Sequence, residues 1–445
     1  MNSTGCVQQR FRRATAGYTP RCWMGTAALL LSAGLLAASG AYAGEVSAYG
    51  PGWSTAHADA SNTNYVPVAG IRDLKLAWQR DLGGSINLGA TSDPTGRVYV
   101  TTSGEGCHLY VLDRDTGETI WCSDKLDRFA VSSSALIDRD GHAYLADSKA
   151  MHAFDRDGKI LWETPIVGVP LSAQFTPSGH LIFTTNIGRI YVLRRDTGAL
   201  VLPSIELIPG AVFDPSKGRA CMRGTEDCPS ANTLAVDKTG RFFFTFWEPG
   251  KKNAGLRAMQ YRDGPKPSIE LLWVNDSLPG GSASSPVLSA DGTRVYVNDN
   301  VESIHAIDTA TGKNIWSFAV GYEAGGCAAV TPEGLIMPAG GGKGVIMALA
   351  DKGDHAEQVW RLDTAINRGI PTQVAGNISY AAVAAGMADN DLLVLDTKTG
   401  AELDRERLPG KPFFTIGTTV GPDGTVYVPT IRGQIYAYRA AGKDN

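Results

Sequence analysis

A short hairpin pattern recurs along this 445-residue chain and constrains its fold more than any other feature. In "LYVLDRDTGETIW" (109–121), apolar residues alternate through one strand, residues 113–117 supply turn chemistry, and Ile120 and Trp121 belong to a second strand. The pattern returns at 151–162, 190–201, 304–316 and 392–403, with a degenerate copy at 345–360. A recurrence of this kind predicts a series of similar β-units.

The tryptophans set the size of the unit. Six of them share one phase of the repeat, and neighbouring copies lie about 41 to 44 residues apart, the period of a four-stranded propeller blade. One such blade cannot bury both of its faces, whereas blades stacked radially can. The fold we expect is therefore all-β, a β-propeller of four-stranded blades. The six residues are Trp78, Trp121, Trp162, Trp273, Trp316 and Trp360.

The two ends of the repeat predict how the ring closes. "LKLAW" (74–78) has the pattern of an outer strand with no blade before it, and the last unit (424–438) lacks an outer strand. Completing that unit with the N-terminal strand gives eight blades, with the ring closed by both chain ends, and seven blades is the alternative. The expected organisation is an N-terminal extension at 44–70 and one propeller domain at 71–440, with a loop insertion at 204–233.

Residues 1–43 have the features of a cleaved export signal. Arginines precede an apolar run that is short for a membrane span, and "AYA" (41–43) has the pattern of a cleavage site. This leader predicts a periplasmic or secreted protein. Because no cysteine stands at the cleavage point, we expect no lipid anchor, and no later apolar stretch is long enough to be a membrane helix. Arg12 and Arg13 leave both general and twin-arginine export open.

Cleavage removes four of the 41 basic residues and none of the 45 acidic ones, and the resulting net charge of −8 argues against a nucleic-acid partner.

Cysteine usage fits an oxidising compartment. Cys221 and Cys228 bracket the short loop "CMRGTEDC", and Cys107 and Cys122 flank the first hairpin at nearly opposed positions. Both pairs are disulfide candidates, although a sequence does not determine connectivity. Cys327 is left over, and we expect it to be buried.

The connections within each blade fall on opposite faces of the ring. The turns between strands one and two, and between strands three and four, are short and formulaic, whereas the second-to-third loops and the blade crossings vary. We call these sides the turn face and the loop face. Function concentrates on variable loops held by a rigid scaffold, and the crossing of about 30 residues at 204–233 is unusually long. Mixed charges on the loop face suit a polar small ligand. The candidate ligand-binding residues are Arg223, Glu226, Asp227, Trp247, Glu248, Asp299, Asn300, Lys343, Arg368 and Arg432.

The most complete copy of the repeat has an alanine, aspartate, threonine, glycine and tryptophan at fixed spacing between Ala306 and Trp316. This pattern resembles the blade-docking motif of pyrroloquinoline quinone (PQQ)-type propellers, the family of quinoprotein alcohol dehydrogenases and their non-enzymatic relatives. Residues 52–78 are similar to the opening segment of that family, and the resemblance covers nearly all of the chain after residue 43. It implies that the tryptophan stacks between neighbouring blades while the aspartate ties down the turn. The aspartates given this structural role are Asp113, Asp155, Asp308 and Asp396.

The chain departs from the enzymes of that family at their cofactor site. It has neither adjacent cysteines nor a Cys-x-x-Cys-His motif, and it is much shorter than they are. The stretch that resembles their Ca²⁺-binding segment is "FFFTFWEPG" (242–250), in which Trp247 and Glu248 precede the proline and the expected asparagine is missing. Glu248 could still supply an oxygen ligand. No catalytic residue and no metal site is assigned.

Three functions are consistent with these features. The preferred one is an exported propeller that binds a small polar ligand or a periplasmic protein on its loop face, with no cofactor assigned. The alternative is a PQQ-dependent oxidoreductase of the alcohol dehydrogenase type, with Ca²⁺ in a modified metal site. The third is a scaffold like the outer-membrane assembly propellers, which resemble this repeat. Whether the protein is an enzyme is left open.

Overall fold

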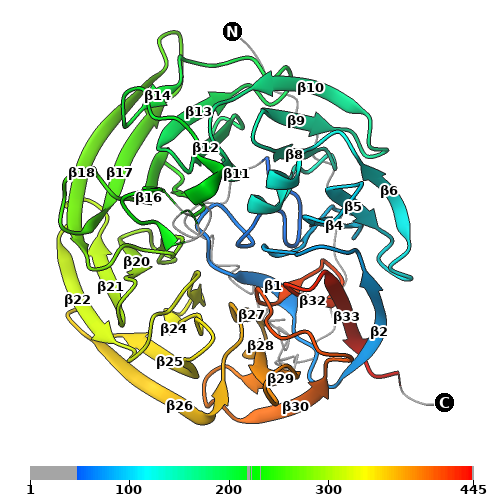
Figure 1. Cartoon of the computed structure of the whole chain (residues 1–445). Coiled ribbons are helices and arrows are strands. Elements are labelled where there is room, and N and C mark those ends of the chain that lie inside the picture. The colour runs from blue at the N-terminus through cyan, green and yellow to red at the C-terminus, as the bar shows by residue number, and fades with distance from the viewer. Residues whose placement is uncertain (1–47, 218–220, 222, 231, 443–445) are drawn as a thin grey trace, which may run out of the picture. The chain divides into compact units, whose positions relative to one another are not determined.

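The computed structural model describes residues 48–217, 221, 223–230 and 232–442. These residues form eight antiparallel four-stranded blades arranged around a ring, and in one blade a fifth strand joins the sheet in parallel. The ring is shown in Figure 1. The eight-bladed β-propeller expected from the tryptophan spacing is therefore confirmed. The predicted export signal at 1–43 lies outside the described residues. In the part of the chain that is described, no helix has the length and apolar character needed to span a bilayer.

The first four blades follow the chain in order, and each starts with its inner strand. Two short 3₁₀ helices, η1 (Arg128–Ser132) and η2 (Pro215–Lys217), lie in the crossings between them. Blade 1 contains β3 (Thr91–Ser92), β4 (Val98–Thr101), β5 (Leu109–Leu112) and β6 (Thr119–Ser123); blade 2 contains β7 (Leu136–Ile137), β8 (Ala143–Ala146), β9 (Ala150–Phe154) and β10 (Ile160–Pro165); blade 3 contains β11 (Pro170–Phe175), β12 (Leu181–Thr185), β13 (Arg189–Leu193) and β14 (Ile205–Glu206); blade 4 contains β15 (Ala235–Val236), β16 (Arg241–Phe246), β17 (Ala254–Arg262) and β18 (Ser268–Leu278).

The last four blades continue in the same way, except that blade 8 draws on both ends of the chain. Blade 5 contains β19 (Val287–Leu288), β20 (Arg294–Asn298), β21 (Ser303–Asp308) and β22 (Asn314–Ala319); blade 6 contains β23 (Ala329–Val330), β24 (Leu335–Met337), β25 (Val345–Asp351) and β26 (Ala356–Ile366); blade 7 contains β27 (Thr372–Ala375), β28 (Ile378–Ala384), β29 (Asn390–Asp396) and β30 (Glu402–Arg407); blade 8 contains β31 (Thr419–Val420), β32 (Val426–Pro429), β33 (Gln434–Ala440) and, as its outer strand, β2 (Leu74–Asp81).

The ring closes where β2 pairs with β33. The two strands are antiparallel, with Leu74 opposite Ala440 and Asp81 opposite Gln434. Trp78, in β2, donates a hydrogen bond from its indole nitrogen to the Arg114 carbonyl of blade 1 (2.8 Å). The N-terminal strand therefore completes blade 8 and also joins that blade to blade 1.

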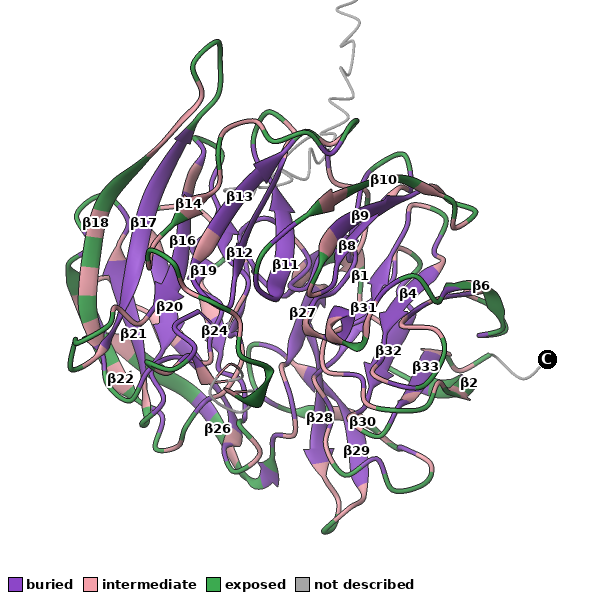
Figure 2. Ribbon diagram, turned by 45° about the horizontal axis from the view of Figure 1, so that its top comes forward, coloured by how far each residue is buried: buried purple, intermediate pink, exposed green. Residues whose placement is uncertain are grey.

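The contact between blades 6 and 7 shows how the repeat docks one blade on the next. Trp360 is buried at 9% exposure, and its indole nitrogen donates to the Thr397 carbonyl in the turn of the next blade (2.9 Å). In that turn Asp396 Oδ1 accepts hydrogen bonds from the backbone and the hydroxyl of Thr399 (both 2.9 Å). Gly400 lies directly against the indole, since a Cβ there would be 2.6 Å from Trp360 Cδ2. Blade stacking buries the inner strands while the outer strands stay partly exposed, as the colours of Figure 2 show.

Residues 53–64, which we call the channel segment, lie inside the ring of blades (Figure 1). At blade 3 the hydroxyl of Thr55 donates to the carbonyl of Ala173 (3.3 Å). At six other blades a backbone oxygen of the segment accepts a hydrogen bond from an inner strand, in chain order. These bonds join Trp53 to Ser92 (2.9 Å), Ser54 to Ile137 (2.8 Å), Ala60 to Val236 (2.7 Å), Ser61 to Leu288 (3.0 Å), Thr63 to Val330 (2.9 Å) and Asn64 to Gln373 (3.0 Å). The chain then continues into β1 (Tyr65–Ala69), which pairs in parallel with β27.

The channel segment crosses the ring toward its turn face. Its partners Ser92, Ile137, Val236, Leu288 and Val330 are each the last residue of an inner strand, next to the turn that leads to the second strand. The segment therefore covers the centre of the ring on that side.

Candidate functional site

A cavity of about 210 Å³ lies on the loop face beside blades 1 to 3. Its lining residues come from blade crossings, from the start of β11 and from the second-to-third loop of blade 3. They are mostly apolar, with three asparagines and one serine and without a charged side chain among the described residues. The lining consists of Asn87, Leu88, Phe129, Val131, Ser132, Val169, Leu171, Asn186, Phe213, Pro215, Cys221 and Asn232.

The long crossing from blade 3 to blade 4 covers one side of this cavity. Phe213 packs edge-to-face on Phe129 of η1, with ring centroids 5.2 Å apart. The N-terminus of η1 is capped by Asp127, whose Oδ1 accepts a hydrogen bond from the Phe129 backbone (2.8 Å). The aromatic pair thus joins the crossing to a short element with a defined position.

A disulfide fixes the other part of the crossing. Both disulfides suggested by the sequence, Cys107–Cys122 and Cys221–Cys228, are formed, and Cys327 is a buried free thiol. Asn186 connects the second disulfide to blade 3, because its Oδ1 accepts from the Val169 backbone (2.9 Å) and its Nδ2 donates to Cys221 Sγ (3.2 Å). The amide of Asn186 therefore holds the cavity wall together.

A second cavity of about 20 Å³ lies deeper, between the channel segment and blades 7 and 8, and Leu88 lines both cavities. His57 borders it and is nearly fully buried, with Nδ1 3.1 Å from Asn64 Oδ1 and Nε2 2.9 Å from Ser285 Oγ. Burial lowers the pKa of His57 to about 4. The imidazole is therefore neutral at neutral pH, and the base of the channel carries no cation there.

The charged candidates of the long crossing lie away from the cavity and contact the protein itself. Arg223 forms an ion pair with Glu323 (2.6 Å), and Asp227 forms one with Lys217 (2.9 Å). Glu226 accepts a hydrogen bond from the Gly250 backbone (3.0 Å). Cys221 is the residue of this loop that lines the cavity in the part of the chain described.

Trp247 and Glu248 are likewise engaged locally. The indole of Trp247 donates to the Lys251 carbonyl (3.0 Å), which closes its own turn. Glu248 pairs with Arg257 (3.1 Å), and that guanidinium lies over the Phe246 ring, 4.2 Å from the centroid. The carboxylate that the sequence offered as an oxygen ligand is therefore opposed by a cation.

Asp299 and Asn300 stabilise the second-to-third loop of blade 5. Asp299 Oδ1 accepts from the backbone of three following residues, and its Oδ2 lies 3.0 Å from His305 Nε2. Burial raises the pKa of Asp299, but the hydrogen bonds from His305 and the backbone outweigh it, so the pKa lies below its usual range. Asn300 accepts from the Ala283 backbone (2.8 Å) and donates to the Arg223 carbonyl (2.7 Å).

The three remaining candidates, Lys343, Arg368 and Arg432, lie together on the loops of blades 6 to 8 and not at the cavity. Sequence reasoning selected charged residues and missed the apolar lining. A usable signal was present, because the crossings that precede the inner strands contain apolar residues such as Leu88, Val131 and Val169 where solvated loops are usually polar.

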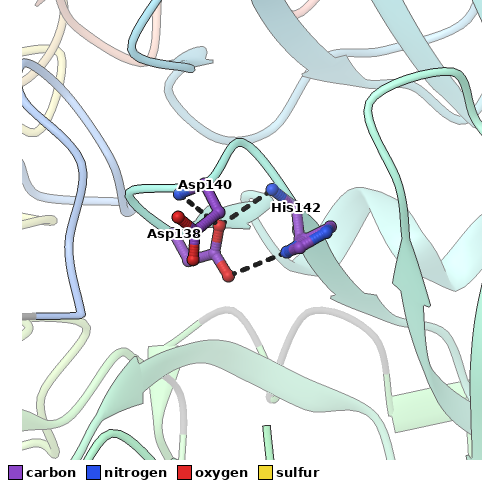
Figure 3. Close-up of side chains that lie close together, drawn as sticks. All are labelled: Asp138, Asp140 and His142. Carbon is purple, nitrogen blue, oxygen red and sulfur yellow. Dashed lines mark hydrogen bonds and ion pairs between the residues drawn. The ribbon is translucent and has the colours of Figure 1, made fainter. Parts of the chain in front are cut away.

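Asp138, Asp140 and His142 bring three potential metal-binding atoms within 4.8 Å of one another on the turn face (Figure 3). Asp138 is buried, and its Oδ1 accepts from the backbone of Asp140 and of His142 (both 2.9 Å). Its Oδ2 accepts from the Tyr144 hydroxyl (3.0 Å) and lies 3.1 Å from His142 Nδ1 and 3.7 Å from Arg195 Nη1. These donors occupy the carboxylate, so the cluster fits a hydrogen-bonded turn better than a metal site.

Comparison with known proteins agrees with this architecture. The family profile PQQ_2, described as outer membrane protein assembly factor BamB, matches residues 68–203 and 266–415. This chain belongs to the PQQ_2 family.

The relatives of this PQQ_2 chain differ in how much of it they match. Protein Rv3035 of Mycobacterium tuberculosis is 30% identical over 87% of the chain and 95% of its own length. Outer membrane protein assembly factor BamB of Yersinia pestis is 23% identical over 46% of the chain and 60% of its own length. Among solved structures, quinohemoprotein alcohol dehydrogenase from Comamonas testosteroni has a TM-score of 0.62 at 14% identity, covering 89% of this chain and 82% of that one. At this identity the likeness shows the fold alone.

The PQQ_2 fold raises the question of whether this member could hold PQQ. PQQ carries three carboxylates, so a site for it needs cations or a metal ion near the ligand. The described lining of the cavity contains no charged side chain, and Glu248 is paired with Arg257. The lining of this cavity and the paired Glu248 therefore do not fit that group.

Proposed function

We propose that this PQQ_2 propeller is an exported binding protein that takes a small ligand into the loop-face cavity. The observation that carries the proposal is the cavity of about 210 Å³, which lies beside a channel whose opposite side is covered by residues 53–64. Concave, mostly apolar sites with a few polar groups are typical of small-molecule binding. Export is supported by the leader pattern at 1–43 and by two disulfides.

The lining indicates the chemistry of the ligand. Phe129, Phe213 and Leu171 offer apolar surface, whereas Asn87 and Asn232 offer amide groups. Burying a charge among such residues would be costly because no described lining residue carries an opposite charge. The ligand expected is an uncharged molecule with an apolar body and one or two hydrogen-bonding groups, which is less polar than the ligand expected from sequence.

Thermal-shift screening of the mature protein against a library of neutral aromatic and aliphatic amides and alcohols tests this proposal. We expect hits whose affinity falls at least about tenfold in Ser132→Trp, because the indole would fill the cavity. Ser178→Trp, at an exposed position in a turn on the other face, is the matched control and should bind like wild type. Hits that bind both variants equally would place the ligand elsewhere, and a library without hits would argue against the function.

Docking of a protein partner on the loop face is the second candidate function. It is supported by relatives named as outer membrane protein assembly factors. The loop face is the side of the ring whose connections vary in length and charge, as interaction surfaces on rigid scaffolds do. Charged residues of the loop face would then serve contact with a protein and not with the small ligand.

A further inference from the structure

Four basic side chains lie on the loops of blades 6, 7 and 8. Lys343 stands in the second-to-third loop of blade 6, Arg368 in the crossing to blade 7, Lys411 in the crossing to blade 8, and Arg432 in the second-to-third loop of blade 8. Lys343, Lys411 and Arg432 are exposed, and Arg368 is half-buried. We call these four residues, together with Met387 and Phe413, the cationic surface.

Backbone contacts hold the loops of this surface together. Arg368 Nη1 donates to the Gly342 carbonyl (3.3 Å), next to Lys343, and Arg432 Nη1 donates to the Lys411 carbonyl (3.1 Å). The Thr415 backbone donates to the Arg368 carbonyl (3.3 Å), which joins the two pairs. The four cations therefore belong to one continuous patch.

The positive charge of the patch is not balanced by ion pairs. None of the four cations is within 4.0 Å of a carboxylate oxygen in the described part of the chain, and the two arginines donate to backbone carbonyls instead. Of the nearby carboxylates, Glu323 pairs with Arg223. Asp389 lies in the second-to-third loop of blade 7, and Asp81 lines a hollow together with Lys411 and Arg80, so cations remain in excess. A patch with an excess of cations on a chain of net charge −4 is an uneven distribution that favours an anionic partner.

Phe413 has a strained backbone within the same patch. Its φ is +65°, and the Phe414 backbone donates to the Pro412 carbonyl across it (2.8 Å), the pattern of a γ-turn with positive central φ. Such turns are rare, and strain of this kind collects at functional sites. The ring is 43% exposed and lies 5.6 Å from the Arg432 guanidinium.

Met387 adds a second exposed apolar side chain beside Phe413. It is 88% exposed, and the Phe413 backbone donates to the carbonyl of the adjacent Ala388 (2.9 Å). Exposed apolar groups surrounded by cations match a segment that carries carboxylates around an apolar residue.

We propose that the cationic surface docks an acidic peptide segment of a partner protein, with an apolar side chain of that segment against Phe413 and Met387. The inference rests on the second proposed function, protein docking on the loop face, and it specifies the chemistry of the partner. It is independent of the small-molecule cavity, which shares no lining residue with the surface.

Fluorescence anisotropy with a labelled synthetic peptide of Asp and Glu around a central Phe tests the proposal on the mature protein. Binding should weaken as salt rises, since exposed charges are screened. The double variant Lys343→Glu/Arg432→Glu should bind at least about tenfold more weakly. Lys313→Glu/Lys398→Glu makes a similar charge change at exposed positions in the turns of the opposite face and should bind like wild type. Phe413→Gly should bind several-fold more weakly without a lower melting temperature, because glycine adopts this φ without strain.

Either of two results in the direct binding measurements would overturn the proposal. One is equal binding of a peptide with Gln and Asn in place of the acids; the other is unchanged affinity in both the charge-reversal and the Phe413→Gly variants. Inorganic phosphate that displaces the labelled peptide as potently as the unlabelled peptide does would show a site for free anions, which would also contradict peptide docking. A photo-crosslinking residue at Met387, used in the native host, separates protein docking on the loop face from the acidic chemistry assigned to the docked segment. Crosslinks to a protein, together with no binding of the acidic peptide, would refute only that chemistry.

Discussion

At the residue scale, the glycine of the repeated turn is explained by the tryptophan of the preceding blade. Gly400 has φ +71°, and a Cβ there would be 2.6 Å from Trp360, whose side chain is buried between blades and cannot retreat. Gly117, Gly158, Gly198 and Gly312 have the same relation to Trp78, Trp121, Trp162 and Trp273. The glycine of each of these turns is therefore required for two reasons: the turn has a positive φ, and the tryptophan of the preceding blade leaves no room for a Cβ.

Comparing two alanine substitutions separates the effect of the backbone from the effect of packing. Gly334→Ala, at φ +85° with no atom near the added Cβ, should lower the free energy of unfolding by about 1–2 kcal/mol through backbone strain alone. Gly400→Ala should lose a further amount of about 1–3 kcal/mol, because the methyl group overpacks the interface with Trp360. Urea denaturation of both variants provides the measurement. Equal losses would show that the indole yields to the methyl group.

At the element scale, the channel segment contains two titratable groups with opposite pKa shifts. Burial lowers the pKa of His57 to about 4, below the usual 6.5, so this group costs stability as pH falls from about 6.5 to 4. Burial raises the pKa of Asp59 to about 6, although hydrogen bonds from Thr63 and Ser61 oppose the rise. The Asp59 carboxylate therefore costs stability above pH 6, and that cost disappears as pH falls toward 4. The two effects oppose each other over the same pH range.

Asp59→Asn should expose the contribution of His57. The amide can keep the hydrogen bonds from the Ser61 and Thr63 backbones (2.9 and 3.1 Å), but it no longer gains stability on acidification. Between pH 6.5 and 4 the variant should lose about 2–3 kcal/mol more than wild type, the equivalent of about two pKa units. Thermal unfolding across this pH range measures the difference. A variant that parallels wild type would mean that Asp59 is ionised normally in the folded protein.

At the scale of the whole molecule, the sequence predicted the features that depend on local repetition. Blade number and ring closure followed from the phase of Trp78 relative to the other tryptophans, because one residue in each repeat makes the same contact with the next blade. The channel segment could not be derived in this way. Its bonds to the inner strands are mostly backbone bonds and reach distant parts of the chain, so no side-chain pattern records them.

The candidate functional site could likewise be predicted from the sequence only in part, because it depends on contacts between distant parts of the chain. Arg223 and Asp227 were selected for their charge, but each pairs with a residue whose position depends on how the long crossing folds over the ring. The cavity instead arises where apolar residues of successive crossings meet, which depends on ring geometry. Lys343, Arg368 and Arg432 were selected singly from the sequence and Lys411 was not, because their grouping depends on the tertiary structure.

The last prediction concerns closure of the ring. A mature chain that starts at residue 71 lacks the channel segment but keeps β2, whereas one that starts at residue 82 also lacks the outer strand of blade 8. The second should be less stable than the first by at least about 3–5 kcal/mol, because removal of a buried tryptophan such as Trp78 alone costs that much and β33 becomes an open edge. Urea denaturation of the two chains measures this difference.

A permuted chain provides the control for that comparison. The Ala441 backbone donates to the Asp73 carbonyl (2.9 Å), so residues 73–81 appended after residue 441 through a short glycine turn could pair with β33 in the native register. Started at residue 82, this chain should regain the stability of the chain that starts at 71, since it differs only in how β2 is connected. If the chains starting at 71 and 82 unfold at the same urea concentration, or the permuted chain regains nothing, the paired strands of blade 8 do not hold the ring closed.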